Sequence, residues 1–177
     1  MNAFLSIRYP DDVYDRLWMP LLFDSWIPIA TNLTIYAGND NAYKLPAAVL
    51  RTAAKPNATT PLNIYWSPQN SLSKFYVYFQ FAEIEMLGAG QWRELTITLN
   101  NERNLRESIK LGYLHPLTIV QNDPPISGSQ IKLSINATGA TMFPPIHNAF
   151  EIFGLKELPN KPTAIGDGMT SSMILYF

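Results

Sequence analysis

Residues 75–100, FYVYFQFAEIEMLGAGQWRELTITLN, carry the pattern from which the fold of this chain can be inferred. Large apolar side chains occupy every second position from Phe75 to Phe81, so an extended backbone places them on one face. After a glycine-containing break, apolar and polar residues alternate again from Leu95 to Leu99. The pattern predicts two strands, and we expect them to belong to one sheet with a buried face.

Further segments carry similar signals. Alternation or an apolar run predicts strands in residues 27–36, 62–66, 113–120, 131–136 and 149–155. Pro116 places its strand at an edge or a bulge, because proline cannot donate to a ladder. Residues 149–155 are apolar on both faces, which is typical of a fully covered strand. Pro46 followed by AAVLRTAA predicts a short helix that ends at Lys55-Pro56.

About seven short strands separated by turn signals indicate the all-β class, an antiparallel β-sandwich with one or two short helices. The length of 177 residues suits one domain with a sizeable core. Charged residues make up 15% of the chain and the formal net charge is −1, which argues against disorder and against a nucleic-acid partner. No signal peptide or membrane-spanning run is visible, and the absence of cysteine leaves the compartment open.

The string DDVYDR at residues 11–16 contains the DDxxD pattern with which isoprenoid synthases hold magnesium and diphosphate. Such sites need carboxylates one helical turn apart on a cavity wall. Here the string follows Pro10 in a β-rich chain and contains its own counter-charge. We therefore favour a structural turn, with no bound metal, in which carboxylates cap backbone groups or pair with arginine. The residues of this structural motif are Asp11, Asp12, Asp15 and Arg16.

Other candidate catalytic groups are sparse. Glu83 and Glu85 would share a face of a continuing strand, as the carboxylates of a glycosidase do, but we favour a solvated pair with no partner that separates their pKa values. His115 and His147 are the only histidines, and there is no cysteine. The chain therefore offers no zinc site, phosphate loop or catalytic triad, and we predict neither a catalytic residue nor a cofactor.

Aromatic residues allow a binding surface. Tyr76 and Tyr78 fall on the outer face of the central strand and Trp92 lies in the loop that follows it, so these three could stack on a sugar. The alternative, which we favour, is that the outer tyrosines contact a second sheet or a neighbouring domain through their apolar bodies.

Three N-glycosylation sequons are present, at Asn32, Asn57 and Asn136. None contains a blocking proline, and together they favour a secreted protein. In that case all three side chains should lie at the surface, because a glycan cannot be buried.

An ordered series of motifs resembles the malectin-like ectodomain of plant leucine-rich-repeat receptor-like kinases. The matching segments are Arg8–Arg16 with Trp18, Pro46 with Val49, Thr52–Ala58, Tyr76–Tyr78, Phe81–Ile84, Arg93, Pro144–Ile146, Asn148–Ala149 and Glu151–Ile152. The resemblance covers roughly residues 7–158. It implies a malectin or jelly-roll type sandwich at 1–158, followed by an irregular tail at 159–177.

The resemblance also implies a function. Such a domain is an extracellular module, on a single-pass membrane receptor, that recognises cell-wall carbohydrate or a peptide. The chain resembles only the second of two lobes, so we expect it to be a fragment with an exposed apolar patch that packs against a second malectin-like lobe in the parent receptor. The alternative is a carbohydrate-active enzyme, or its sugar-binding accessory domain, since one fold hosts both.

Overall fold

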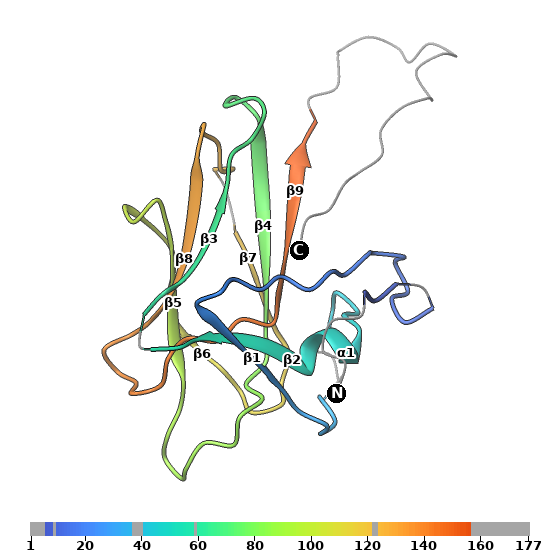
Figure 1. The fold of residues 1–177 in the computed structure, drawn as a ribbon, viewed down its shortest axis with the longest axis vertical. Coiled ribbons are helices and arrows are strands. Elements are labelled where there is room, and N and C mark those ends of the chain that lie inside the picture. The colour runs from blue at the N-terminus through green and yellow to red at the C-terminus, as the bar shows by residue number, and fades with distance from the viewer. Residues whose placement is uncertain (1–5, 9, 37–40, 59, 122–123, 157–177) are drawn as a thin grey trace.

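The computed structural model describes residues 6–8, 10–36, 41–58, 60–121 and 124–156. Two antiparallel sheets face each other, and a two-stranded ribbon lies across one end of them (Figure 1). The predicted all-β sandwich is therefore confirmed. Within the described residues, no helix is long and apolar enough to cross a membrane.

The larger sheet has four strands in the order β3-β8-β5-β6. Their bounds are Leu62–Trp66 for β3, Ile131–Ala137 for β8, Glu94–Leu99 for β5 and Arg103–Lys110 for β6. Strands β5 and β8 alternate as the sequence predicts, because their apolar residues point to the core and their polar residues point outward. Ser134 is the exception on β8, since it is buried and its hydroxyl donates to the Asn63 side chain at 2.7 Å.

The smaller sheet has the order β7-β4-β9. Its strands are Lys74–Phe81 for β4, Leu117–Val120 for β7 and Ala149–Leu155 for β9. The prediction that the strand after Pro116 lies at an edge is confirmed, because β7 pairs only with β4. Phe79 pairs with Phe150 of β9 and with Ile119 of β7, so one face of all three strands is apolar.

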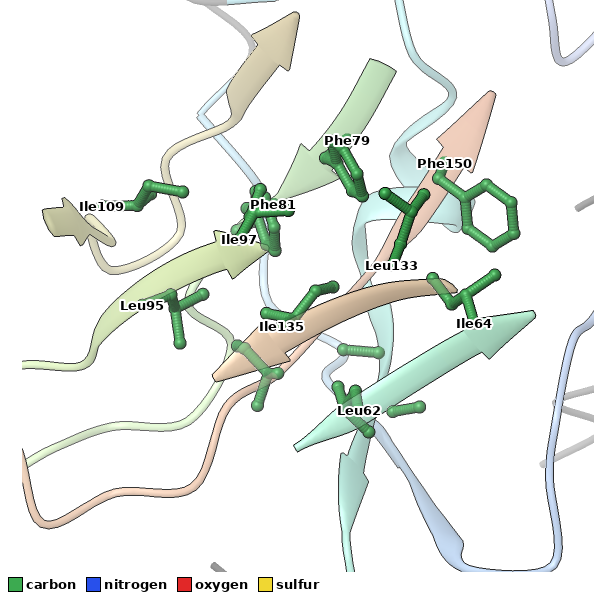
Figure 2. Close-up of a cluster of buried hydrophobic side chains, with 14 of the residues drawn as sticks. Leu62, Ile64, Phe79, Phe81, Leu95, Ile97, Ile109, Leu133, Ile135 and Phe150 are labelled. Carbon is green, nitrogen blue, oxygen red and sulfur yellow. The ribbon is translucent and has the colours of Figure 1, made fainter. Parts of the chain in front are cut away.

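The core fills the space between the two sheets. Figure 2 shows side chains from both sheets pointing toward one another. The labelled residues are Leu62, Ile64, Phe79, Phe81, Leu95, Ile97, Ile109, Leu133, Ile135 and Phe150. Each fully buried side chain of this size contributes roughly 1.5–3 kcal/mol to folding relative to an exposed one. The apolar alternation of the sequence is thus the source of the sandwich.

A small ribbon closes one end of the sandwich. Strand β1, Trp26–Ala30, pairs antiparallel with β2, Thr52–Pro56, and helix α1, Ala47–Leu50, precedes β2. Ala54 exchanges two backbone hydrogen bonds with His147, which ties the ribbon to the segment that leads into β9.

Two expectations about local structure are wrong. The predicted helix after Pro46 is only one turn long, since residues 52–56 form β2 instead. Alanine favours helix, but an isolated helix this short is only marginally stable, and pairing with β1 outweighs that preference here. The strand predicted within 27–36 rested on the alternation at 32–36, but that segment is irregular and Leu33 is exposed. The strand of this region lies earlier, as β1.

The expected pairing of the two central strands is also wrong. Strand β4 belongs to the smaller sheet and β5 to the larger one, so the connection between them crosses from one sheet to the other. Alternation reveals which face of a strand is buried and carries no information about its neighbour. Both strands therefore direct their apolar faces into the same core from opposite sides.

Two edge strands differ from the sequence predictions. No strand was expected at 103–110, yet β6 pairs there with β5 through register shifts. Its residues are largely exposed, and an exposed polar edge strand leaves little apolar pattern to detect. Strand β9, expected to be fully covered, is an edge strand whose Gly154 and Leu155 are exposed.

Candidate functional site

The outer face of the smaller sheet carries an aromatic cluster. Tyr76 and Tyr78 of β4 alternate with the core residues and lie beside Phe153 of β9. The Tyr78 ring packs against Phe153 with centroids 4.8 Å apart and edge-to-face against Tyr43 at 5.5 Å. These rings are half-buried. We call Tyr43, Tyr76, Tyr78 and Phe153 the aromatic face, and nothing in the sequence pattern placed Tyr43 or Phe153 in it.

Buried polar groups lie on the same side of this sheet, farther along β4. Gln80 donates to Glu151 at 2.9 Å and accepts from the Thr118 hydroxyl at 2.6 Å. Glu151 is only 2% exposed, and an Arg16 nitrogen lies 3.4 Å from its carboxylate. Burial raises the pKa of Glu151, while Arg16 opposes this shift. The groups satisfy one another, so few remain for a ligand.

The aspartate string forms a turn that is locked by arginine. Asp12 is fully buried and accepts from Arg16 Nε at 2.8 Å, from Trp18 Nε1 at 2.6 Å and from the Tyr14 amide at 2.8 Å. The Arg16 guanidinium also donates to the carbonyls of Tyr43 and Lys44. This turn therefore holds one edge of the aromatic face.

The other two aspartates lie at the surface. Asp15 pairs with Arg8 at 2.8 Å, and both side chains are more than half exposed. Asp11 is exposed as well. Among the described residues, no group of three or more histidine, cysteine, aspartate or glutamate side chains could hold a metal ion. The three carboxylates do not face a common cavity, which a magnesium site requires.

Glu83 and Glu85 are not a solvated pair, so that expectation is wrong. Arg93 is fully buried between them, with Nε 2.8 Å from Glu83 and Nη2 2.9 Å from Glu85. The contact between Arg93 Nε and Glu83 is a buried ion pair, since the two side chains are 0% and 2% exposed. Lys55 also pairs with Glu85, and Arg93 donates to the Pro144 carbonyl at 3.0 Å.

The two carboxylates of this cluster have different pKa values. Burial raises the pKa of Glu83 despite Arg93. Burial acts in the same direction on Glu85, but hydrogen bonds from Lys55 and Arg93 outweigh it and lower that pKa. An arginine between two carboxylates neutralises them and leaves no space for a sugar, so the geometry is that of a structural clamp rather than a glycosidase pair.

His147 lies within the core and has no hydrogen-bond partner for either ring nitrogen among the described residues. Its ring packs on Phe150, Phe81 and Phe79, with centroids 5.6, 5.4 and 6.2 Å away. Burial lowers the pKa of His147 to about 3, so the ring is neutral at physiological pH. His115 is exposed and packs on Tyr36.

The structure does not bring the three proposed stacking residues together. Trp92 precedes β5 of the larger sheet, whereas Tyr76 and Tyr78 lie on β4 of the smaller one. Trp92 is 37% exposed, Lys110 Nζ lies 4.3 Å from its ring centroid, and its indole nitrogen donates to Glu94. A cation thus already covers one face of this ring.

The sequon asparagines lie in different environments. Asn32 and Asn57 are exposed in irregular segments. Asn136 is half-buried on β8, an interior strand, and its amide donates to the Ser134 carbonyl at 3.3 Å. None of the three side chains is enclosed in the core.

Comparison with known proteins gives a family. A sequence model described as the malectin-like domain matches residues 1–155. A putative leucine-rich repeat receptor-like serine/threonine-protein kinase of Arabidopsis thaliana, At2g19230, is 35% identical over 167 residues. That alignment covers 92% of this chain and 19% of the relative, so the chain spans about a fifth of the relative's length.

Solved structures share the fold. The extracellular domain of ANXUR2 from Arabidopsis thaliana superimposes with a TM-score of 0.69 at 17% identity, covering 88% of this chain and 48% of that one. A structure of the plant peptide RALF23 in complex with FER and LLG2 gives a TM-score of 0.65 at 20% identity, covering 86% of this chain and 46% of that one. At these identities the likeness shows the fold alone.

Proposed function

This chain belongs to the malectin-like domain family, and from that premise we propose that it is a ligand-recognition module from the extracellular part of a plant receptor-like kinase. The observation that carries the proposal is the 35% identity to a leucine-rich repeat receptor-like kinase over nearly the whole chain. In such a receptor the domain would sit outside the cell, on a protein anchored in the membrane. Residues 1–158 would form one lobe, with 159–177 as a tail.

We infer that the ligand is a peptide or protein segment rather than a glycan. A related fold binds RALF23 together with LLG2, which supports a peptide partner for this fold. The aromatic rings of Tyr76, Tyr78 and Trp92 do not form one stacking platform, and the buried polar groups beside the aromatic face are already paired. Apolar bodies of half-buried tyrosines instead suit contact with another protein surface.

We also propose that the module has no catalytic activity. The paired carboxylates of Glu83 and Glu85 are neutralised by Arg93, and those of the aspartate turn are engaged by arginine. The alternative function, a carbohydrate-active enzyme or its accessory domain, would need a free acid and base near a sugar-sized cleft. Hydrolysis of any cell-wall polysaccharide by the purified chain would favour that alternative.

A second malectin-like lobe is a further proposed partner. The chain covers about half of each solved extracellular domain, 48% for ANXUR2 and 46% for the FER complex, which leaves room in such proteins for a second lobe. Exposed apolar side chains of the N-terminal segment would contact it. These side chains are Leu17, Phe23 and Ile27.

Binding measurements test the proposed ligand class. The immobilised chain is exposed to RALF23, to a panel of other secreted plant peptides, and to cell-wall oligosaccharides. We expect saturable binding of at least one peptide, weakened tenfold or more by Tyr76→Ala and unchanged by Trp92→Ala. If the chain binds oligosaccharides but no peptide, and Trp92→Ala abolishes that binding, the ligand is a sugar and the peptide proposal is wrong.

A further inference from the structure

A cavity of about 500 Å³ lies between the N-terminal segment and the end of the sandwich. Its walls come from residues 18–22, from β1 and β2, from helix α1 and from the start of β9. The volume falls within the range of small-molecule sites, roughly 300–1,000 Å³. The cavity is separate from the aromatic face, since none of the residues Tyr43, Tyr76, Tyr78 and Phe153 lines it.

The walls are apolar and contain two indole rings. Trp18, Trp26, Leu21, Val49 and Phe150 contribute to them. Met19 and Leu22 also line the cavity and are 40% and 38% exposed, so an apolar ligand meets an apolar rim on entry. Polar side chains are the minority of the lining residues, and they are Ser6, Asp11, Thr52, His147 and Asn148.

The polar groups in the walls restrict the ligand further. Asn148 is engaged, because its amide donates to the carbonyls of Leu50 and Thr52 and its oxygen accepts from Ala82. Asp11 is the one charged side chain of the lining, and it is exposed. The buried ring of His147 also lines the cavity, and neither of its nitrogens has a hydrogen-bond partner among the described residues. An exposed carboxylate at this place repels an anionic ligand and can accept a hydrogen bond from a hydroxyl or an amine.

We propose that this cavity binds a small, mainly apolar molecule that carries a hydroxyl or amino donor and no negative charge. The apolar part would lie against Trp18 and Trp26, and the donor would face Asp11 at the mouth. This site is independent of the peptide-binding function proposed above, because it lies on different residues. A receptor module with both sites would respond to a small molecule and a protein partner separately.

A fluorescent probe tests the site. The probe is 1-aminoanthracene, a neutral, flat and mainly apolar molecule with one amino donor, and anthracene-1-carboxylate is its anionic counterpart. We expect saturable binding of the neutral probe by the full chain, with fluorescence enhancement, and at least tenfold weaker binding of the carboxylate. Asp11→Asn should reduce the difference in affinity between the two probes, because it removes the negative charge at the mouth of the cavity.

A matched pair of variants tests whether the probe binds inside the cavity. Ala47 and Ala48 are both exposed on helix α1, but only Ala48 lines the cavity. Ala48→Phe should fill the cavity and weaken probe binding tenfold or more, whereas Ala47→Phe should leave it unchanged. Thermal denaturation of both variants checks that they fold alike.

Three results would overturn the proposal. The first is no saturable binding of the neutral probe at 100 μM protein, taken as an upper limit for a specific small-molecule site. The second is equal binding by both alanine variants. The third is a dimer in sedimentation that Ala48→Phe dissociates, because a second copy of the chain would then occupy the cavity.

Discussion

The side chains of Arg16 and Glu151 meet at 3.4 Å although 135 positions separate them in the sequence. Arg16 also pairs with Asp12 at 2.8 Å, so one guanidinium serves two carboxylates that are 0% and 2% exposed. This contact fastens the N-terminal turn to strand β9 of the smaller sheet. The aspartate string that resembles a magnesium motif therefore forms a turn that makes a tertiary contact with β9.

Removing Arg16 should destabilise the fold strongly. Arg16→Met leaves two buried carboxylates without a counter-charge, and breaking such a pair costs about 3–5 kcal/mol. Arg8→Ala removes only the exposed pair with Asp15 and should cost less than about 1 kcal/mol. Urea unfolding of the two variants gives the comparison, and equal losses would show that Arg16 does not carry this role.

The cluster of Arg93 with Glu83 should show strong coupling. Arg93→Met alone leaves Glu83 buried and charged, so we expect a loss of about 3–5 kcal/mol. Adding Glu83→Met to the same chain removes that buried charge and should recover part of the stability. A double-mutant cycle in urea measures the coupling, and simple additivity would contradict a direct ion pair.

Stability should fall at acid pH because of His147. Its folded pKa is about 3 and its unfolded pKa is near 6.5, so between these values the unfolded state binds the extra proton. The contribution of His147 to stability is complete above pH 6.5 and is lost as pH falls toward 3, by about 1.4 kcal/mol per pH unit at most.

A variant isolates this effect from other groups. Glu83 and Glu151 have raised pKa values, so in the folded state they gain protons earlier than in the unfolded state and oppose the trend of His147. His147→Phe suits the surrounding phenylalanines and removes the titrating ring. The thermal midpoints at pH 7.5 and pH 5 should differ less in this variant than in the parent. An unchanged difference would show that His147 is not the cause of the acid destabilisation.

Glycosylation should occur at the exposed sequons. Expression through a secretory pathway should add one glycan each at Asn32 and Asn57, which lie at the surface. Asn32→Gln and Thr34→Ala should each remove the same glycan, because both destroy one sequon. Intact-mass spectrometry measures the shift, and the parent mass without any glycan would count against a secreted protein.

The aspartate turn should not bind magnesium. The carboxylates of Asp12 and Asp15 are already paired with Arg16 and Arg8. Calorimetric titration with magnesium chloride should show no saturable heat in the micromolar range. Saturable binding that Asp12→Asn abolishes would restore the metal interpretation of this string.

Much of the fold follows from local pattern. Strands β3, β4, β5 and β8 lie where alternating residues predict them, because their apolar faces are buried against one core. The prediction is poorest for β2 and β6. In β2 the preference of alanine for helix opposes the observed strand, and in β6 exposed polar residues leave no periodic signal.

The candidate site was predicted less well than the fold. Tyr76 and Tyr78 fall on the outer face as their position in the alternation requires. Their partners Tyr43 and Phe153 come from distant segments, and Trp92 lies in the loop directly before β5 of the other sheet. Spacing along one strand cannot reveal which other segment covers its face.

The class of this protein follows from its sequence pattern. Its alternating apolar residues indicate a β fold in which one face of each strand is buried, and a two-layer sandwich is such a fold. The ordered motifs shared with receptor ectodomains lie within the segment that the malectin-like family matches. The tertiary structure alone decided that β4 and β5 lie in opposite sheets, that Arg93 separates Glu83 from Glu85, and that a cavity lies beside Trp18. These features depend on contacts between distant segments, and buried charges find their partners only after the core has brought those segments together.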